Sequence, residues 1–260
     1  MKVGIVGCGV MGSAMARMIS ENHEVTLFSR NKKGVQELAK EIGAQAALSI
    51  EDLGKQCEAV VLAVKPKDLE EVAEDLDPAI TKGTLLLSIL VGTPTSRLGE
   101  CFSNAKVFSL MPNLPLLCGK GLIAIAETGE ELPEEKEKVN QILKGLGTTF
   151  WLSEKLINPF AALTGSNPAF IYLIVEAMVQ AGITMGFNAK LSEELVLKTI
   201  EGSIELLQYT GDSPSALQKA ISSPGGTTIA GLNQLEKRGV RYGILSAILK
   251  TLERGKEMED

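Results

Sequence analysis

Residues 2–12 read KVGIVGCGVMG, a short apolar run that leads directly into three glycines, Gly7, Gly9 and Gly12. An apolar strand followed by G-x-G-x-x-G and a helix is the pattern that binds the pyrophosphate of a dinucleotide. The first glycine permits a tight turn, the second admits the pyrophosphate, and the third lets the helix pack on the strand. The amides of the first helical turn face the phosphates. The alternative is a glycine-rich structural turn. We predict a dinucleotide site formed by Gly7, Cys8, Gly9, Val10, Met11 and Gly12.

The end of the next expected strand, residues 24–28, indicates which dinucleotide is bound. A site that prefers NAD usually carries an acid at this point, which binds the ribose 2′-hydroxyl. This strand is instead followed by Ser29, Arg30 and Asn31. We therefore predict that Ser29 and Arg30 bind the 2′-phosphate of NADPH, with NADH possible. Lys32 and Lys33, the next residues, are more simply explained as a solvated helix start.

Composition excludes several classes of function. The 260 residues are 45% hydrophobic and 22% charged, with a net charge of −6, and they contain no basic stripe for nucleic acid. The four cysteines lack a C-x-x-C pair, which is typical of reduced cytosolic thiols. His23 is the one histidine, so a histidine-based catalytic triad or metal site is not expected. We expect a cytoplasmic protein with no signal peptide and no membrane span.

Two regions with different periodicity divide the chain. Up to residue 152, short β-branched runs alternate with helical stretches, which is typical of an α/β domain with a largely parallel sheet. The expected strands are 2–6, 24–28, 58–63, 84–88, 106–109, 121–125 and 148–152. The expected helices are 11–21, 32–42, 50–55, 68–78, 94–101 and 133–145. Beyond Trp151 only helical periodicity remains. We predict a nucleotide-binding domain at 1–153 and an all-α domain at 154–260.

The helical region predicts an oligomer. Residues 156–186 are expected to form a long helix interrupted near 165–168, followed by helices at 191–209, 214–221, 228–237 and 239–256. Apolar residues cover most of the circumference of the segment between Ile171 and Met185. A helix that is apolar nearly all round is normally buried. A domain of about one hundred residues buries such a helix most easily against a second subunit, so we expect an intertwined dimer or a larger oligomer.

Three motifs in the first region follow expected strands, where ligands of open α/β sheets collect. They are Ala63-Val64-Lys65-Pro66, the segment that begins at Ser88, and Met111-Pro112-Asn113. Lys65 either approaches the cofactor or supports a turn. The small side chain of Ser88 would let the backbone approach the nicotinamide. Asn113 offers an amide to the nicotinamide or to a water, although a local turn explains it equally well.

The segment Ser222-Ser223-Pro224-Gly225-Gly226-Thr227-Thr228 is the most informative part of the second region. It precedes an apolar helical face, so its turn delivers two hydroxyls and free amides to a helix N-terminus. A simple helix cap would not need two consecutive glycines. We predict that this segment binds a carboxylate.

Taken in order, G-x-G-x-x-G, A-V-K-P, M-P-N, G-S-x-P-A and S-P-G-G-T-T-I-A-G-L resemble pyrroline-5-carboxylate reductase over essentially the whole chain. The resemblance implies reduction of 1-pyrroline-5-carboxylate to L-proline with NAD(P)H, the last step of proline synthesis. It implies a Rossmann-type domain followed by a helical dimerisation domain, in a homodimer or a decamer of five dimers. The implied cofactor residues are Gly7–Gly12, Ser29, Arg30, Ala63, Val64, Lys65, Pro66 and Ser88. The implied substrate residues are Ser223, Gly226, Thr227 and Thr228, to which the turn adds Gly225, with Thr228 near the ring nitrogen as the catalytic residue.

The chain departs from the usual family pattern at Ser109, Asn167 and Phe170. These departures leave open a reductase of another cyclic imine acid, such as a six-membered ring. They also leave open a regulatory protein that binds NAD(P)H without turnover, although a sensor would not need Thr227 and Thr228. A hydroxyacid dehydrogenase is disfavoured. It would need a lysine or a histidine as an acid at the start of the helical domain, where Lys155 is the one lysine.

Overall fold

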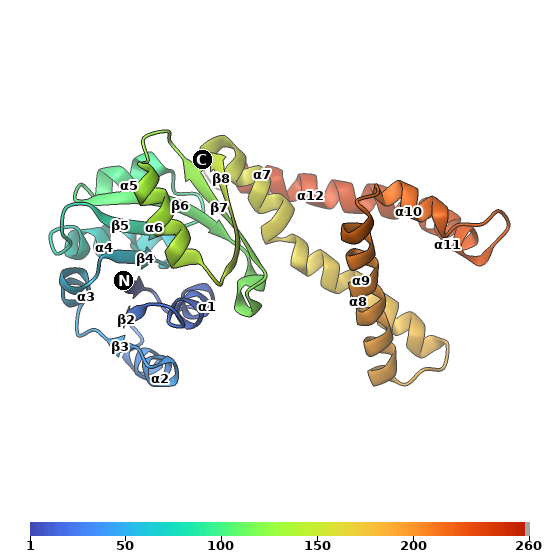
Figure 1. Cartoon of the computed structure of the whole chain (residues 1–260), viewed down its shortest axis with the longest axis horizontal. Helices are drawn as coiled ribbons and strands as arrows, with labels where there is room; N and C mark the ends of the chain where they lie inside the picture. Colours follow the sequence, from blue (N-terminus) through green and yellow to red (C-terminus); the bar gives the residue numbers. More distant parts are fainter. Residues whose placement is uncertain (258–260) are drawn as a thin grey trace. The chain divides into compact units, whose positions relative to one another are not determined.

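A single sheet of eight strands forms the first part of the computed structural model, which describes residues 1–257 (Figure 1). The strand order is β3-β2-β1-β4-β5-β6-β7-β8. The strands are β1 (Lys2–Val6), β2 (Glu24–Phe28), β3 (Gln45–Ala46), β4 (Ala59–Leu62), β5 (Thr84–Ser88), β6 (Ala105–Pro112), β7 (Gly121–Glu127) and β8 (Gly147–Ser153). Strands β1 to β6 all pair in parallel, which confirms the expected nucleotide-binding architecture.

The sheet reverses direction at β7, which pairs antiparallel with β6, and β8 then pairs parallel with β7. A parallel neighbour needs a crossover of about a dozen residues or more. The link from β6 to β7 is short and consists mainly of the 3₁₀ helix η2 (Leu114–Cys118). The chain therefore turns back beside β6.

Helices cover both faces of the sheet, as expected for a doubly wound fold. The helices of this region are α1 (Val10–Ile19), α2 (Lys32–Ile42), α3 (Ile50–Gln56), α4 (Leu69–Leu76), α5 (Thr95–Cys101) and α6 (Pro133–Leu143), with 3₁₀ turns η1 (Pro66–Asp68) and η3 (Glu154–Leu156). Apolar side chains of α1, α2 and α6 share one buried cluster, and those of α3, α4 and α5 share the other. Local signals set several ends. Asn31 caps α2 by accepting from the Gly34 amide, and Gly43 ends it in the left-handed conformation.

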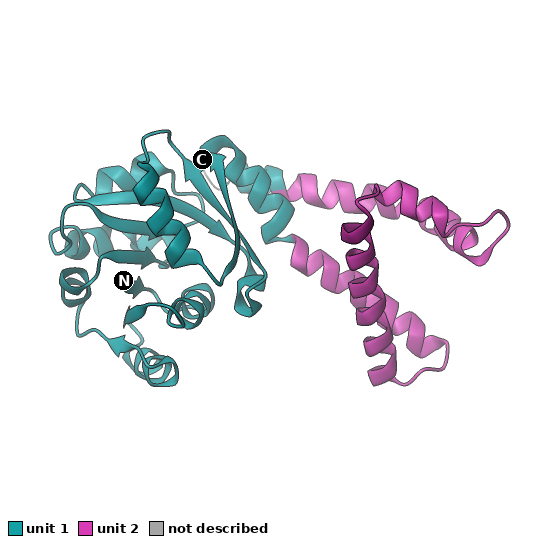
Figure 2. Cartoon of the chain, in the orientation of Figure 1, with its two compact units in different colours: residues 1–166, 252–260 teal, residues 167–251 magenta. Residues whose placement is uncertain are grey.

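The chain forms two compact units (Figure 2). The first contains residues 1–166 and the end of the chain from residue 252, and the second contains residues 167–251. The sheet ends at Ser153, where the sequence places the domain boundary. The compact units divide later, after α7 (Ile157–Phe160) and the π-helical turn η4 (Ala161–Gly165). The boundary at 153/154 thus stays a prediction.

The second unit contains only helices among its residues, which confirms the expected all-α region. They are α8 (Asn167–Thr184), α9 (Ala189–Thr210), α10 (Pro214–Ala220), α11 (Thr227–Lys237) and α12 (Val240–Glu257), the last of which continues into the first unit. Helices α8 and α9 form a hairpin in which the Ser192 hydroxyl donates to the Val179 carbonyl at 2.7 Å. A Cβ on Gly182 would lie 2.1 Å from that hydroxyl, so the glycine permits the close approach.

One helical stretch, Glu154–Thr184, is long and apolar enough by length and composition to cross a membrane, and 6% of its most apolar window is buried. A single helix of this kind does not establish a membrane span, so the expectation of no span stays a prediction. The exposed apolar side chains of α8 include Ile171, Leu173 and Met178.

Candidate functional site

The glycine loop after β1 has the geometry that a pyrophosphate requires. Gly7 has φ +101° and donates its amide to the Phe28 carbonyl at 2.8 Å. A Cβ on Gly7 would lie 2.4 Å from the Ala63 carbonyl oxygen, and one on Gly12 would lie 1.9 Å from the Gly7 carbonyl oxygen. A Cβ on Gly9 would meet no atom within 4 Å, so space is open above that residue. These residues fit a dinucleotide, because two glycines allow close packing and the third leaves the approach clear.

A cavity of about 290 Å³ lies beside this loop, at the carboxyl ends of three parallel strands. Its walls come from the residues after β1, β2 and β4, and from η1 and α4. Strand order reverses between β1 and β4, and the crevice at such a reversal is where open α/β sheets bind ligands.

The structure brings together most of the predicted cofactor residues at this cavity. They are Gly7, Cys8, Gly9, Ser29, Arg30, Ala63, Val64 and Lys65. Val10, Met11 and Gly12 belong to the first turn of α1, which begins beside the cavity, and Pro66 begins η1. Gly9 is the N-cap and has no side chain, so no cap side chain occupies the end of this helix.

Burial separates Ser88 from this group. Its side chain is fully buried at the end of β5, and its hydroxyl accepts a hydrogen bond from the Leu90 amide at 3.3 Å. This bond stabilises the turn that follows β5. The buried hydroxyl of Ser88 is therefore not the group expected to meet the cofactor. That the small side chain lets the backbone approach the nicotinamide stays a prediction.

Asn113 is buried and joins three parts of the first unit. Its side-chain carbonyl accepts from the Leu122 amide at 2.8 Å, and its side-chain amide donates to the Thr164 carbonyl at 3.1 Å. The residue thus links the end of β6 to β7 and to the π-helical turn. Both ends of its amide group are engaged, so its contact with a nicotinamide stays a prediction while its structural role is direct.

Sequence reasoning missed the acid that faces Arg30. Asp68 lies at the end of η1, and the Arg30 guanidinium donates to its two carboxylate oxygens at 2.8 and 3.4 Å. The Asp68 side chain is 12% exposed, whereas that of Arg30 is 71% exposed. The available signal was proximity in sequence, because Asp68 follows the A-V-K-P motif by two residues.

The Cys8 thiol in the loop is held neutral at ordinary pH. Burial raises its pKa from 9.0 to about 11, because a thiolate is poorly solvated there. A neutral thiol adds no negative charge beside the expected phosphates and is a weak nucleophile. Cys8 therefore serves packing rather than covalent chemistry.

The predicted substrate residues form a separate group in the second unit. Gly225 has φ +70°, and the Gly226 amide donates to the Ser223 carbonyl at 3.0 Å, which closes the turn. Gly226 is the N-cap of α11, and Thr227 and Thr228 form its first turn, with both residues exposed. A Cβ on Gly226 would lie 2.5 Å from the Ser223 hydroxyl, so the glycine leaves room for that side chain in its present position. The segment has the helix N-terminus and the hydroxyls that a carboxylate site requires.

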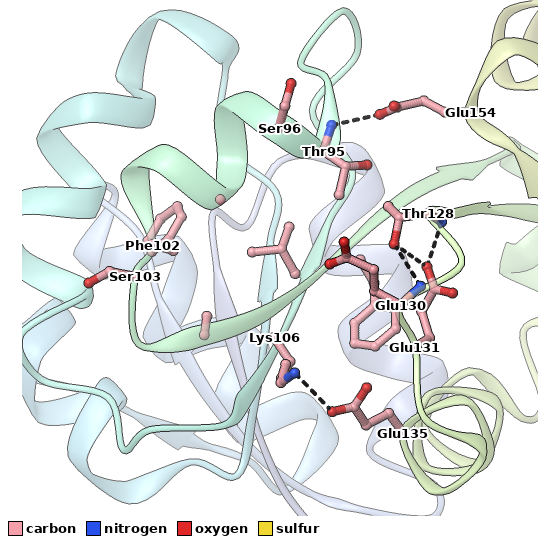
Figure 3. Close-up of a pocket in the computed structure, with 14 residues that line it drawn as sticks. Thr95, Ser96, Phe102, Ser103, Lys106, Thr128, Glu130, Glu131, Glu135 and Glu154 are labelled. Atoms are coloured by element: carbon pink, nitrogen blue, oxygen red, sulfur yellow. Dashed lines mark hydrogen bonds and ion pairs between the residues drawn. The ribbon is translucent and has the colours of Figure 1, made fainter.

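A larger cavity of about 560 Å³ lies away from the glycine loop, between α5, β6 and the segment that follows β7 (Figure 3). Four glutamates line it, and other groups of the first unit engage the carboxylates of three of them. Lys106 pairs with Glu135 at 3.6 Å, Thr128 donates to Glu131, and the Thr95 amide donates to Glu154 at 2.7 Å. This cavity shares no residue with the predicted site. Within residues 1–257, no group of three or more His, Cys, Asp or Glu side chains is placed to hold a metal ion.

Comparison with known proteins connects both units to one group of enzymes. The family described as "Pyrroline-5-carboxylate reductase dimerisation" matches residues 154–258, and that described as "NADP oxidoreductase coenzyme F420-dependent" matches residues 2–92. The pyrroline-5-carboxylate reductase of Aquifex aeolicus is 35% identical over 99% of this chain and 97% of its own length. The Glycine max protein of the same name is 30% identical over 98% of this chain and 95% of its own length.

Solved structures agree with these matches. The pyrroline carboxylate reductase of Plasmodium falciparum with NADP bound superposes with a TM-score of 0.89 at 31% identity, covering 100% of this chain and 98% of that one. The Streptococcus pyogenes 1-pyrroline-5-carboxylate reductase superposes with a TM-score of 0.87 at 32% identity, covering 99% of this chain and 98% of that one.

Proposed function

Because the chain belongs to the pyrroline-5-carboxylate reductase family, we propose that it reduces 1-pyrroline-5-carboxylate to L-proline with NAD(P)H. The observation that carries this function is the 35% identity to the Aquifex aeolicus reductase over 99% of the chain. The glycine loop and its cavity support it independently, because they fit the cofactor that such a reduction needs. The alternatives of a six-membered imine acid and of a sensing role are not favoured by any observation.

The reaction asks little acid–base chemistry of the protein. The substrate has a C=N bond whose nitrogen is itself basic. Once that nitrogen is protonated, the imine carbon accepts a hydride. Bound NAD(P)H supplies that hydride. One proton has to reach the ring nitrogen, and it stays there when the nitrogen becomes the secondary amine of proline, so a single donor suffices and no strong acid–base pair is required. The chain has to orient two rings and exclude misaligned poses, which is catalysis by proximity and orientation.

For cofactor binding we propose the residues of the glycine loop and the strand ends. Gly7–Gly12 hold the pyrophosphate against the first turn of α1, and Ser29 and Arg30 hold the adenosine ribose end. Ala63, Val64, Lys65 and Pro66 form the opposite wall, while Ser88 and Asn113 complete the nicotinamide end.

For substrate binding we propose the turn before α11. Ser223, Gly225, Gly226, Thr227 and Thr228 present amides and hydroxyls to the substrate carboxylate. Thr228 is the proposed catalytic residue, whose hydroxyl, directly or through a water, supplies the proton to the ring nitrogen. The support is local geometry: Gly226 is the N-cap of α11, and the two threonines follow it. Amides at a helix N-terminus bind anions.

The enzyme acts as an oligomer on a small-molecule substrate. The match of residues 154–258 to a dimerisation family and the exposed apolar side chains of α8 support this assembly. For the finer arrangement we propose a homodimer formed through the helical unit, with a decamer of five dimers as the full assembly. We also propose a cytoplasmic location and no membrane or nucleic-acid partner.

The test is cofactor oxidation by the purified protein with 1-pyrroline-5-carboxylate, run beside a six-membered cyclic imine acid. We expect rapid oxidation with the five-membered ring and at least tenfold lower kcat/KM with the six-membered ring, a difference of about 1.4 kcal/mol in transition-state binding. Preference for the larger ring would change the substrate. Tight NAD(P)H binding without turnover of either ring would move the protein to a sensing role.

A further inference from the structure

The ion pair between Arg30 and Asp68 stands where the two possible cofactors differ. Arg30 follows β2, the position that faces the ribose 2′ group in dinucleotide-binding folds. Its guanidinium contacts both oxygens of Asp68, at 2.8 and 3.4 Å. The Asp68 side chain is 12% exposed, so its charge is mostly shielded from water and Arg30 is its partner. The positive charge that a 2′-phosphate would use is therefore already engaged.

The neighbouring charges along α4 add to this effect. Asp68, Glu71 and Asp75 recur at spacings of three and four residues, which places them on one side of the helix. All three line the cavity, together with the two cations Arg30 and Lys65. The lining residues thus carry three carboxylates against two cations, and a phosphate dianion entering this end meets net negative charge.

Asp68 also supplies the group that β2 lacks. In sites that bind NAD, a carboxylate at the end of the second strand accepts a hydrogen bond from the ribose 2′-hydroxyl. Here the carboxylate comes from the turn after β4, and its ion pair brings it beside Arg30, the second residue after β2. If Arg30 turned to a 2′-phosphate, Asp68 would be left as a shielded charge without its partner, which is unfavourable.

We propose that Asp68 is the residue that determines cofactor specificity, and that it lowers the preference for NADPH by holding Arg30 and by accepting from the 2′-hydroxyl of NADH. This inference rests on the proposed function only in that the cavity binds NAD(P)H. We therefore expect the dissociation constants of NADPH and NADH for the wild-type protein to lie within about tenfold of each other, a difference of less than about 1.4 kcal/mol.

The test measures binding rather than turnover. Each cofactor is titrated by its nicotinamide fluorescence into wild-type protein and into Asp68→Asn, which keeps the shape and removes the charge. We expect Asp68→Asn to bind NADPH about tenfold more tightly, equivalent to 1.4 kcal/mol, and to bind NADH no more tightly than the wild type. Competition with adenosine 2′,5′-bisphosphate and with AMP locates the effect: affinity for the bisphosphate rises, whereas affinity for AMP does not.

Glu74→Gln is the matched control, because it removes one carboxylate from the same helix outside the cavity lining. We expect it to leave the ratio of the two dissociation constants unchanged. If Asp68→Asn changed the dissociation constants of NADPH and NADH by the same factor, Asp68 would have a merely structural role and the inference would be overturned. If that variant does not fold, the ratio of the two wild-type dissociation constants decides: a preference for NADPH above about tenfold, or 1.4 kcal/mol, contradicts the proposal.

The two proposals fail separately. Absence of turnover with either imine, combined with the predicted binding shift, would reject the function and keep the role of Asp68. The opposite result is turnover of 1-pyrroline-5-carboxylate by the wild type, with no change in the ratio of the NADPH and NADH dissociation constants in Asp68→Asn. It would keep the function and reject the role of Asp68.

Discussion

Single glycines determine whether the first turn can form at all. Gly7 and Gly12 stand where neighbouring carbonyl groups leave no room for a Cβ, whereas Gly9 faces open space. Gly7 and Gly12 are therefore required for close packing, and Gly9 leaves space for the cofactor. Each of these roles can be tested by a single substitution.

Gly12→Ala tests the packing contact. Its Cβ would lie 1.9 Å from the Gly7 carbonyl oxygen, and backbone has to move to relieve that overlap. We expect the free energy of unfolding, measured by urea denaturation, to fall by about 1–3 kcal/mol and NADPH affinity to fall with it. Gly99→Ala is the control, because that glycine is helical and its Cβ would meet open space. A Gly12→Ala protein as stable as the Gly99→Ala protein would refute the packing argument.

Thr228 tests the substrate end. Because its hydroxyl stands in the first turn of α11 and outside the glycine loop, Thr228→Ala should lower kcat by about 10²–10⁴-fold, the range for a lost proton donor. NADPH affinity should stay at the wild-type value. Thr228→Ser, which restores the hydroxyl, should recover most of the rate. Unchanged turnover in Thr228→Ala would remove this residue from the site.

At the scale of elements, Asn113 holds the point where the sheet reverses. Asn113→Ala leaves the Leu122 amide and the Thr164 carbonyl without their side-chain partner. We expect a loss of about 1–3 kcal/mol in the free energy of unfolding by urea denaturation. Because Asn113 is also proposed at the nicotinamide end, we expect the folded variant to bind NADPH more weakly than the wild type. Asn22→Ala, at an exposed asparagine, is the control. A variant that loses stability and keeps the wild-type NADPH affinity would remove the Asn113 side chain from the cofactor site.

The elements that sequence reasoning missed have little sequence signal. Strand β3 consists of two exposed residues, Gln45 and Ala46, which count as a strand only because they pair with β2. Two residues are too few to show a period of two. The reversal at β7 depends on a short connection rather than on any property of the strand itself. Helices with caps and apolar periodicity, such as α2, were predicted at their observed bounds of Lys32–Ile42.

The site shows the same limit. Residues inside contiguous motifs, such as Gly7 and Ala63, could be predicted because motif and strand end coincide in sequence. Asp68 could not, since its role depends on β4 lying beside β1, which brings the turn after β4 to Arg30. Asn113 was correctly singled out, but the partners of its amide, Leu122 and Thr164, lie 9 and 51 residues away.

At the scale of the whole molecule, the helical unit exposes more apolar surface than a monomer normally does. On α8 alone, Ile171, Leu173 and Met178 are 51%, 66% and 38% exposed. A second copy of the chain would cover this surface, in agreement with the dimerisation family matched by residues 154–258.

Leu173→Glu tests the assembly. A carboxylate within an apolar interface would be desolvated without a partner, so we expect this variant to dissociate to monomers in light scattering at micromolar concentration. Turnover should fall as the assembly is lost. Leu48→Glu, at an apolar side chain that is 88% exposed in the first unit, should leave the oligomer intact. A Leu173→Glu variant that keeps the wild-type mass would show that α8 lies outside the interface.

Transfer of the hydride from the cofactor to the substrate can be followed directly with a deuterium label. The protein is incubated with 1-pyrroline-5-carboxylate and NADPH that carries deuterium at both positions of the nicotinamide C4, and the product is analysed by NMR and mass spectrometry. We predict L-proline that carries one deuterium on the ring carbon of the former C=N bond. NADPH that binds but yields no labelled proline, under conditions where the protein is folded and oligomeric, would show that the protein does not reduce 1-pyrroline-5-carboxylate.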